Sequence, residues 1–296
     1  MKIYNILILA LFLAACNQVV EEAETANGAT QNQEASSSLS PLESRVIQAE
    51  ERLNQNEAGA KVWRAIESHG GLEKWYGNGL LQFHFDYQPE PGQSGLRRNT
   101  LSLNNYWSSQ STHTIQGEEG LQFGFDGQRA WSTTGEKVGG INPRFWSLTP
   151  YYFVGLPFVL ADEGLVFESL PDAQMGDMSY HLVKASYESG TGDAPDDYYI
   201  LYLNPETGQL DALRYIVSYP GFFEPGQHSP EKLMRLTGKT TVDGMVLPTA
   251  YETSMWQDGS PSPVVTRIDV SDYAFLTEDN SGALNMPEGA QEYIGL

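Results

Sequence analysis

Residues 80–87 read LLQFHFDY, and at this stretch the hydrophobic pattern of the chain changes. Before it, apolar residues recur every three or four positions, as they do on the buried face of a helix. From Leu80 onward, apolar and polar residues alternate, which is typical of a strand with one buried face. Leu81, Phe83, Phe85 and Tyr87 would then share the buried face of the first strand.

Similar runs follow this strand as far as residue 273, and turn sequences separate them. The runs cover residues 97–103, 106–116, 121–125, 129–133, 165–170, 179–187, 198–203, 210–219, 236–242, 245–252 and 264–273. Asp126-Gly127, Asp243-Gly244 and Asp258-Gly259 are dipeptides that favour hairpin turns, and residues 204–208 (NPETG) form another tight reversal. Short strands without helices between them predict one large antiparallel meander or open barrel.

Most of the expected helices come before this meander. Ser40-Pro41-Leu42-Glu43 is a capping-box pattern, which predicts a helix from Pro41 to about Leu53. A second helix is predicted over residues 57–68, ended by Gly70-Gly71, and a short helical turn over residues 72–76. The expected fold class is therefore mainly β (α+β).

The N-terminus predicts where the protein resides. Residues 1–16 read MKIYNILILALFLAAC, with a positive Lys2 and an apolar run too short to cross a bilayer. The ending Leu-Ala-Ala-Cys resembles a bacterial lipobox, in which the cysteine is acylated and the signal is cleaved before it. Residues 1–15 are thus predicted to be a signal peptide and Cys16, the only cysteine, the lipidation site.

Residues 17–40 read NQVVEEAETANGATQNQEASSSLS and contain no aromatic residue. Such a segment cannot bury enough surface to offset its backbone entropy, so residues 16–41 are predicted to be the lipidated cysteine and a disordered acidic tether. Residues 42–296 are predicted to form a single domain. Asn17 after the cysteine resembles outer-membrane sorting in Gram-negative lipoproteins, with the domain on either the periplasmic or the surface face.

One segment interrupts the meander, at residues 142–160 (NPRFWSLTPYYFVGLPFVL). It holds six aromatic residues within residues 145–158. Pro143 and Pro150 predict a short helix followed by an extended piece that ends near Pro157. The segment is either a core helix that plugs the concave side of the sheet or a lid over an apolar ligand.

Several turn motifs resemble one family. Residues 123–131 (FGFDGQRAW), 199–210 (YILYLNPETGQL) and 242–248 (VDGMVLP) resemble strand–turn–strand segments of LolA/LolB-type lipoprotein carriers, with Asn204 where an Asp is usual. The pattern from Ala65 through His69-Gly70-Gly71 to Trp75 is similar to Bacteroidota outer-membrane lipoproteins of this architecture. The resemblance implies a half-barrel of strands curled around helices, with an apolar cavity for acyl chains.

Composition excludes several functions. The chain has 17 Lys and Arg against 38 Asp and Glu, a net charge of −21, which disfavours nucleic-acid partners. Its histidines lack metal-binding spacing, and no nucleophile elbow, phosphate loop or cofactor motif occurs. His84 and Asp86 on one strand, and the cluster of Asp193, Asp196 and Asp197, are the nearest approaches to a catalytic or calcium site, and an exposed strand face and an acidic turn explain them better. No enzyme, cofactor or metal is expected.

The expected function is therefore non-catalytic binding of an apolar ligand (an acyl chain, lipid or lipidated peptide) by a lipid-anchored envelope protein. The alternatives are a surface module that binds glycan or protein through exposed aromatics such as Trp107 and Trp256, and a hydrolase without a recognisable motif. No sequence feature specifies an oligomeric state. The candidate ligand-binding residues are aromatic: Phe83, Phe85, Phe123, Phe125, Trp131, Phe145, Trp146, Tyr151, Phe153 and Phe158.

Overall fold

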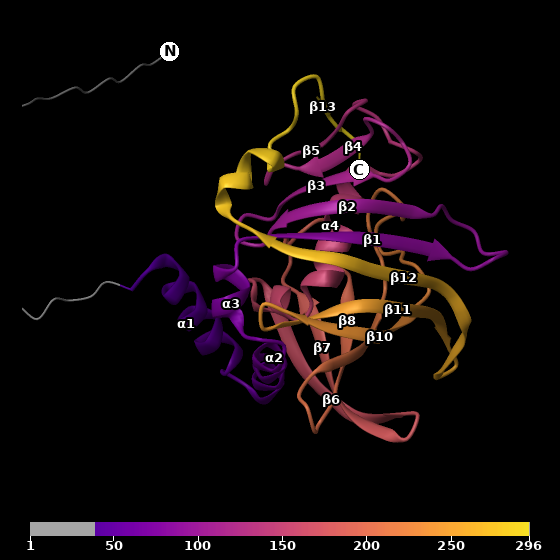
Figure 1. Ribbon diagram of the computed structural model, residues 1–296. Coiled ribbons are helices and arrows are strands. Elements are labelled where there is room, and N and C mark those ends of the chain that lie inside the picture. The colour runs from indigo at the N-terminus through magenta and orange to yellow at the C-terminus, as the bar shows by residue number, and fades with distance from the viewer. Residues whose placement is uncertain (1–38, 296) are drawn as a thin grey trace, which may run out of the picture. The chain divides into compact units, whose positions relative to one another are not determined.

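The computed structural model describes residues 39–295 (Figure 1). The predicted signal peptide, the lipidation of Cys16 and nearly all of the predicted tether lie outside these residues. Three helices open the described chain: α1 (Pro41–Leu53), α2 (Glu57–Ser68) and α3 (Leu72–Gly77). The predicted capping box is present, because Ser40 Oγ accepts from the Glu43 amide at 3.2 Å and Glu43 Oε2 accepts from the Ser40 amide at 2.7 Å.

Thirteen strands form one sheet, and neighbouring strands are antiparallel. The first five are β1 (Leu80–Pro89), β2 (Arg98–Asn105), β3 (Gln110–Ile115), β4 (Gln122–Phe125) and β5 (Ala130–Ser132). The next seven are β6 (Leu165–Met175), β7 (Met178–Tyr187), β8 (Tyr198–Leu203), β9 (Leu210–Tyr215), β10 (Lys232–Val242), β11 (Met245–Gln257) and β12 (Ser260–Leu276). Two short 3₁₀ helices, η1 (Phe158–Ala161) and η2 (Glu278–Leu284), and strand β13 (Gln291–Glu292) complete the described elements.

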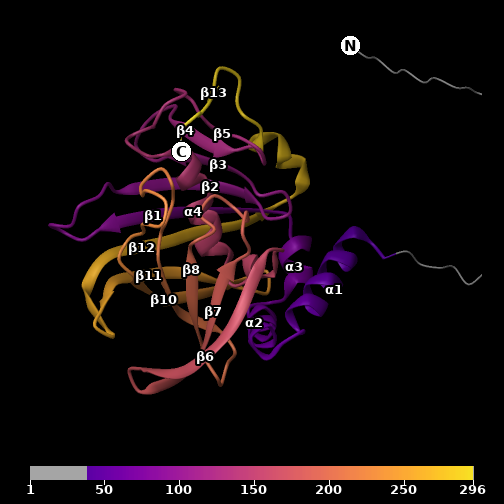
Figure 2. The ribbon, with the colours of Figure 1, turned by 180° about the vertical axis from the view of Figure 1, so that it is seen from behind.

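The strand order explains the one interruption of the meander. The order is β13-β5-β4-β3-β2-β1-β12-β11-β10-β9-β8-β7-β6, so β1 to β5 run outward to one side and β6 starts at the far edge. The chain must therefore cross the sheet between β5 and β6, and helix α4 (Pro143–Gly155) makes this crossing. Figures 1 and 2 show α4 within the curve of the sheet. The predicted fold class, a mainly β half-barrel with N-terminal helices and a helical aromatic insertion, is confirmed.

The prediction was wrong about Pro150. The helix does not break there but continues to Gly155, with Pro150 buried inside it. A proline within a helix frees carbonyl groups in the preceding turn, and these must find other donors. The N–H that Pro150 lacks would have bonded to the Trp146 carbonyl. In the same turn, the Ser147 carbonyl accepts from Ser111 Oγ and from His113 Nε2, both at 3.1 Å, so strand β3 holds this part of the helix.

A proline and a turn explain two differences between the observed and the predicted strand bounds. Strand β6 was expected to end at Leu170, before Pro171, but it extends to Met175. It is an edge strand, and its pairing skips from Leu170 to Ala173, so the missing N–H of Pro171 breaks no pair. Conversely, the predicted strand over residues 106–116 starts only at Gln110, because Tyr106 to Ser109 form a turn in which Ser109 has φ of 58°. The short strand β13 was not predicted.

Candidate functional site

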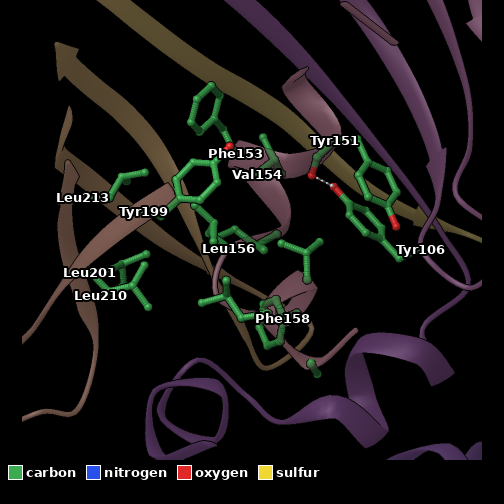
Figure 3. Packing of buried hydrophobic residues seen from close by; sticks show 14 of the residues in the cluster. Tyr106, Tyr151, Phe153, Val154, Leu156, Phe158, Tyr199, Leu201, Leu210 and Leu213 are labelled. Atoms are coloured by element: carbon green, nitrogen blue, oxygen red, sulfur yellow. Dashed lines mark hydrogen bonds between the residues drawn. The ribbon is translucent and has the colours of Figure 1, made fainter. Parts of the chain in front are cut away.

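Side-chain hydrogen bonds hold both ends of helix α4. The Asn142 side chain caps its N-terminus by accepting from the Phe145 amide at 3.1 Å. The last carbonyls of a helix lack helical partners. Here Tyr106 donates to the Tyr151 carbonyl at 3.0 Å, drawn in Figure 3, and Tyr251 donates to the Phe153 carbonyl at 2.8 Å. The C-terminal half of α4 is therefore tied into the concave face.

The end of this helix and the segment after it belong to the core. Val154, Leu156 and Phe158 are buried in the apolar cluster that also contains Leu201, Leu210 and Leu213 of β8 and β9 (Figure 3). The Phe158 ring stacks on Trp75 of α3 with centroids 4.3 Å apart. Two alternatives were given for the insertion, a core helix or a lid. This part of the insertion is packed as a core element.

One side of α4, from Arg144 to Phe153, borders a cavity of about 520 Å³. Nearly half of the lining residues are aromatic, and they come from both halves of the sheet as well as from α4. They are Tyr87, Phe125, Phe145, Trp146, Tyr151, Tyr152, Phe153, Tyr187, Tyr199, Tyr215 and Tyr219. A concave, aromatic-lined space of this size falls in the range of small-molecule sites, which is about 300–1,000 Å³.

Tyrosines from three adjacent strands form one wall of this cavity. Tyr199 of β8 lies directly opposite Tyr215 of β9 in the strand register, and their rings stack at 6.0 Å. Tyr187 of β7 donates to the hydroxyl of Tyr152 on α4 at 2.7 Å, and the Tyr152 ring stacks on Tyr199 at 5.0 Å. Burial raises the pKa of Tyr187 to about 12, so the wall is uncharged at neutral pH.

Four charged residues also line the cavity. Arg144 binds Asp193 through two hydrogen bonds of 2.6 and 2.8 Å, while its guanidinium lies 4.2 Å from the Phe125 ring centroid. The Asp197 carboxylate accepts from the Ser218 amide at 2.5 Å, and burial raises its pKa. Lys232, the first residue of β10, is half-buried with its Nζ 5.7 Å from the Tyr215 ring centroid.

The structure divides the ten aromatic candidates into two groups. Phe125, Phe145, Trp146, Tyr151 and Phe153 line the cavity together. The other five are buried and do not line it: Phe83, Phe85, Phe123, Trp131 and Phe158. The second group packs within the core: the Phe123 ring stacks on His113 of the neighbouring strand β3 with centroids 4.8 Å apart, and Phe158 stacks on Trp75 of α3.

Sequence reasoning missed the tyrosine wall and the charged residues. Tyr187, Tyr199 and Tyr215 each lie in a predicted strand, and the reversal at residues 204–208 sets the register that places Tyr199 opposite Tyr215. The turn sequence could therefore have predicted that Tyr199 and Tyr215 lie opposite each other. No sequence motif marks Lys232, because its place beside the cavity depends on the pairing of β10 with β9, in which it lies opposite Tyr215.

The other candidate polar groups have structural partners. His84 contacts Asn99, and Asp86 binds Arg97 with Arg97 Nε 2.8 Å from Asp86 Oδ1. Asp193 of the acidic cluster pairs with Arg144. Within residues 39–295, no group of three or more His, Cys, Asp or Glu side chains is arranged to hold a metal ion.

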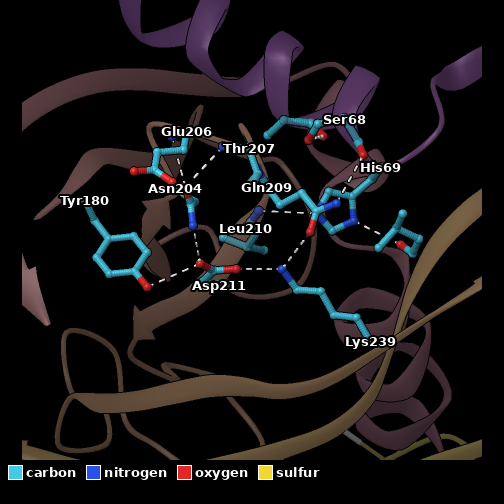
Figure 4. Close-up of polar contacts among 12 residues, drawn as sticks. Ser68, His69, Tyr180, Asn204, Glu206, Thr207, Gln209, Leu210, Asp211 and Lys239 are labelled. Atoms are coloured by element: carbon cyan, nitrogen blue, oxygen red, sulfur yellow. Dashed lines mark hydrogen bonds and ion pairs between the residues drawn. The ribbon is translucent and has the colours of Figure 1, made fainter. Parts of the chain in front are cut away.

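His69 is likewise a structural tie (Figure 4). Its Nδ1 donates to the Val246 carbonyl at 2.9 Å and its Nε2 accepts from the Leu210 amide at 3.2 Å. Nearby, Lys239 Nζ lies 2.6 Å from Asp211 Oδ1. These contacts hold the end of α2 against β9 and the β10–β11 hairpin.

No protein-family model matches the sequence, and no characterised protein matches it significantly. Solved structures similar in fold include a LolA superfamily protein from Nitrosomonas europaea, at 12% identity and a TM-score of 0.47, covering 75% of this chain and 96% of that one. A DUF1329 family protein from Desulfovibrio piger has 11% identity and a TM-score of 0.49, covering 78% and 100%. A domain assigned to outer-membrane lipoprotein sorting, from Vibrio parahaemolyticus, has 12% identity and a TM-score of 0.47, covering 77% and 99%.

These similarities are of fold. The described chain forms an open antiparallel sheet curved around a helix, the half-barrel architecture that the sequence predicted. In the part of the chain that the structure describes, no helix is both long enough and apolar enough to cross a membrane.

Proposed function

We propose that this protein binds an apolar ligand, an acyl chain or lipid, in the cavity beside α4. The observation that carries the proposal is the cavity itself, which has a volume of about 520 Å³ and in which nearly half of the lining residues are aromatic. Filling such a space with hydrocarbon removes apolar surface from water on both partners, worth roughly 25 cal/mol per Å² before the costs of association. The Tyr187 hydroxyl donates to that of Tyr152, so the Tyr187 proton has a partner within the protein and needs none from a ligand.

The fixed position of α4 supports binding in a preformed site. Tyr106 and Tyr251 hold its C-terminal carbonyls, and Ser111 and His113 hold its middle. A ligand would therefore enter beside the helix rather than displace it. Preformed sites lose less free energy to ordering on binding.

We further propose that Cys16 anchors the protein in a bacterial cell envelope, at the outer membrane. The support is the lipobox, Leu-Ala-Ala-Cys at residues 13–16, behind a short apolar run. Substituting Cys16→Ala should abolish incorporation of an alkyne fatty acid, because no other residue in the chain can form the thioether lipid. Label that persists on the Cys16→Ala protein would contradict the anchor.

Ligand binding is tested by filling the cavity. Leu148 lines it from α4 and is half-buried, so Leu148→Trp should reduce the affinity for aminoanthracene, an uncharged apolar fluorophore, by about tenfold or more, since the added ring occupies the site. The matched control is Leu101→Trp, because Leu101 on β2 is partly exposed and does not line the cavity. Equal affinities of both variants and wild type, or no binding by wild type, would refute the proposed site.

The alternative of a glycan-binding or protein-binding surface is less well supported by the tryptophans named for it. The guanidinium of Arg45 lies 4.7 Å from the Trp107 ring centroid, and that of Arg214 lies 4.7 Å from Trp256. One face of each ring is therefore occupied by a side chain of the protein. Glycan binding without retention of apolar probes would nevertheless favour this function.

A further inference from the structure

Lys232 differs from the other charged residues of the cavity in its contacts. Arg144 and Asp193 neutralise each other through two hydrogen bonds. Asp197 is held by the backbone amide of Ser218. Among the described residues, no carboxylate lies within 4.0 Å of Lys232 Nζ. The ammonium instead faces the Tyr215 ring, whose centroid is 5.7 Å away.

This arrangement is unfavourable without a ligand. Burial lowers the pKa of Lys232, while the more distant Asp197 acts in the opposite direction. A half-buried ammonium beside aromatic rings has lost part of its hydration and has gained no ion pair in return. In a chain of net charge −21, a cation placed against an apolar cavity without a contacting acid indicates a counterion supplied from outside.

We infer that the ligand of this cavity is an amphiphile with an anionic head group, a carboxylate or a phosphate, which pairs with the Lys232 ammonium while its acyl chain lies along the aromatic walls. The inference rests on the proposed function. The geometry separates the two parts of such a molecule, because Lys232 opens β10, next to the end of β9 at Tyr215, whereas Phe145 and Trp146 line the cavity from α4. A charge-assisted contact in a partly desolvated site is stronger than a neutral one.

The test compares ligands that differ only in the head group. Palmitate, hexadecyl phosphate and the uncharged hexadecanol would each be titrated against aminoanthracene bound to the purified full-length protein. We expect at least one anionic ligand to bind about tenfold more tightly than hexadecanol. The stronger of the two anions identifies the head group as carboxylate or phosphate.

Variants then assign the preference to Lys232. Lys232→Met keeps the length of the side chain and should reduce the affinity for the anion to that for hexadecanol, without changing hexadecanol binding; Lys232→Arg should restore the preference. Lys184→Met is the control, because Lys184 also lies over a tyrosine, with Nζ 5.0 Å from the Tyr198 ring centroid, but does not line the cavity.

The outcomes separate this inference from the proposed function. Equal affinities of wild type for palmitate, hexadecyl phosphate and hexadecanol would overturn the anionic head group while leaving apolar binding intact. An equal loss of all ligands in Lys232→Met would show a structural role instead. Failure of wild type to bind aminoanthracene at all would refute the proposed function, and the inference with it.

Discussion

His113 connects the sheet to the middle of helix α4 through both of its ring nitrogens. Its Nε2 donates to the Ser147 carbonyl at 3.1 Å, so in the neutral ring Nδ1 accepts from Ser102 Oγ at 2.8 Å. Burial lowers the pKa of His113 from 6.5 to about 4. In this neutral state the ring holds the Ser147 carbonyl, in the turn of α4 that precedes Pro150.

This pKa predicts a loss of stability in acid. Below about pH 6.5 the unfolded chain binds a proton at this residue, whereas the folded chain binds it only near pH 4. The stabilising contribution is therefore complete above pH 6.5 and is lost as the pH falls toward 4, by up to about 3 kcal/mol. In urea unfolding, His113→Gln should be less stable than wild type at pH 7 but should show a flatter dependence on pH across this window.

The comparison isolates one residue because other groups remain unchanged. Burial also lowers the pKa of His69 to about 4, and it raises the pKa values of Asp162 and Asp197, which acts in the opposite direction on acidification. All of these groups are present in both proteins. His181→Gln, at a half-exposed site, serves as the control. Parallel curves for His113→Gln and wild type would contradict the assignment.

At the scale of elements, helix α2 docks on the β10–β11 hairpin through a close backbone approach. The Val246 amide donates to the His69 carbonyl at 2.8 Å, and Gly70 follows with φ of 125°. A Cβ atom on Gly70 would lie 2.5 Å from the Gly244 carbonyl oxygen. Gly70 is therefore needed for two reasons, its backbone conformation and the contact with the turn of the hairpin.

Gly70→Ala should separate these two reasons. Gly92 also has positive φ, but nothing lies within 4 Å of a Cβ atom placed there. Gly92→Ala should therefore cost only the backbone strain, about 1–2 kcal/mol. Gly70→Ala should cost roughly 1–3 kcal/mol more in the free energy of unfolding, as over-packing does. Equal losses in the two variants, measured by urea unfolding, would show that the contact with Gly244 adds nothing.

The elements also show which parts of the structure the sequence could predict. The bounds of α1 and α2 were predicted because caps such as Ser40 with Glu43 are formed by residues close in sequence. The continuation of α4 through Pro150 was not predicted, because the side chains that hold this turn at the Ser147 carbonyl, Ser111 and His113, come from strand β3. The same holds for the residues that line the cavity. The aromatic residues of α4 could be predicted from their density in the sequence, whereas the places of Tyr187 and Lys232 depend on strands that meet only in the folded sheet.

At the scale of the whole sheet, the half-barrel stays open and both of its edges are protected. On one side the last strand, β13, has only two residues, and it pairs with β5. On the other side β6 is interrupted by a bulge between Leu170 and Ala173 that contains Pro171 and Asp172. Proline, charge and irregular pairing are the features by which edge strands avoid pairing with another molecule.

Removing one of these features should promote self-association. Pro171→Thr restores an N–H and a residue with high strand propensity in the middle of the β6 edge, so a second copy of the chain could extend the sheet across it. We expect a larger share of oligomers than in wild type at equal concentration, rising with concentration in analytical ultracentrifugation, and little change in the free energy of unfolding. The control is Pro225→Thr, in the exposed loop between β9 and β10, which lies in no strand and should leave the distribution of species as in wild type. If Pro171→Thr and wild type sediment identically over the same range, then Asp172 and the bulge protect this edge without the proline.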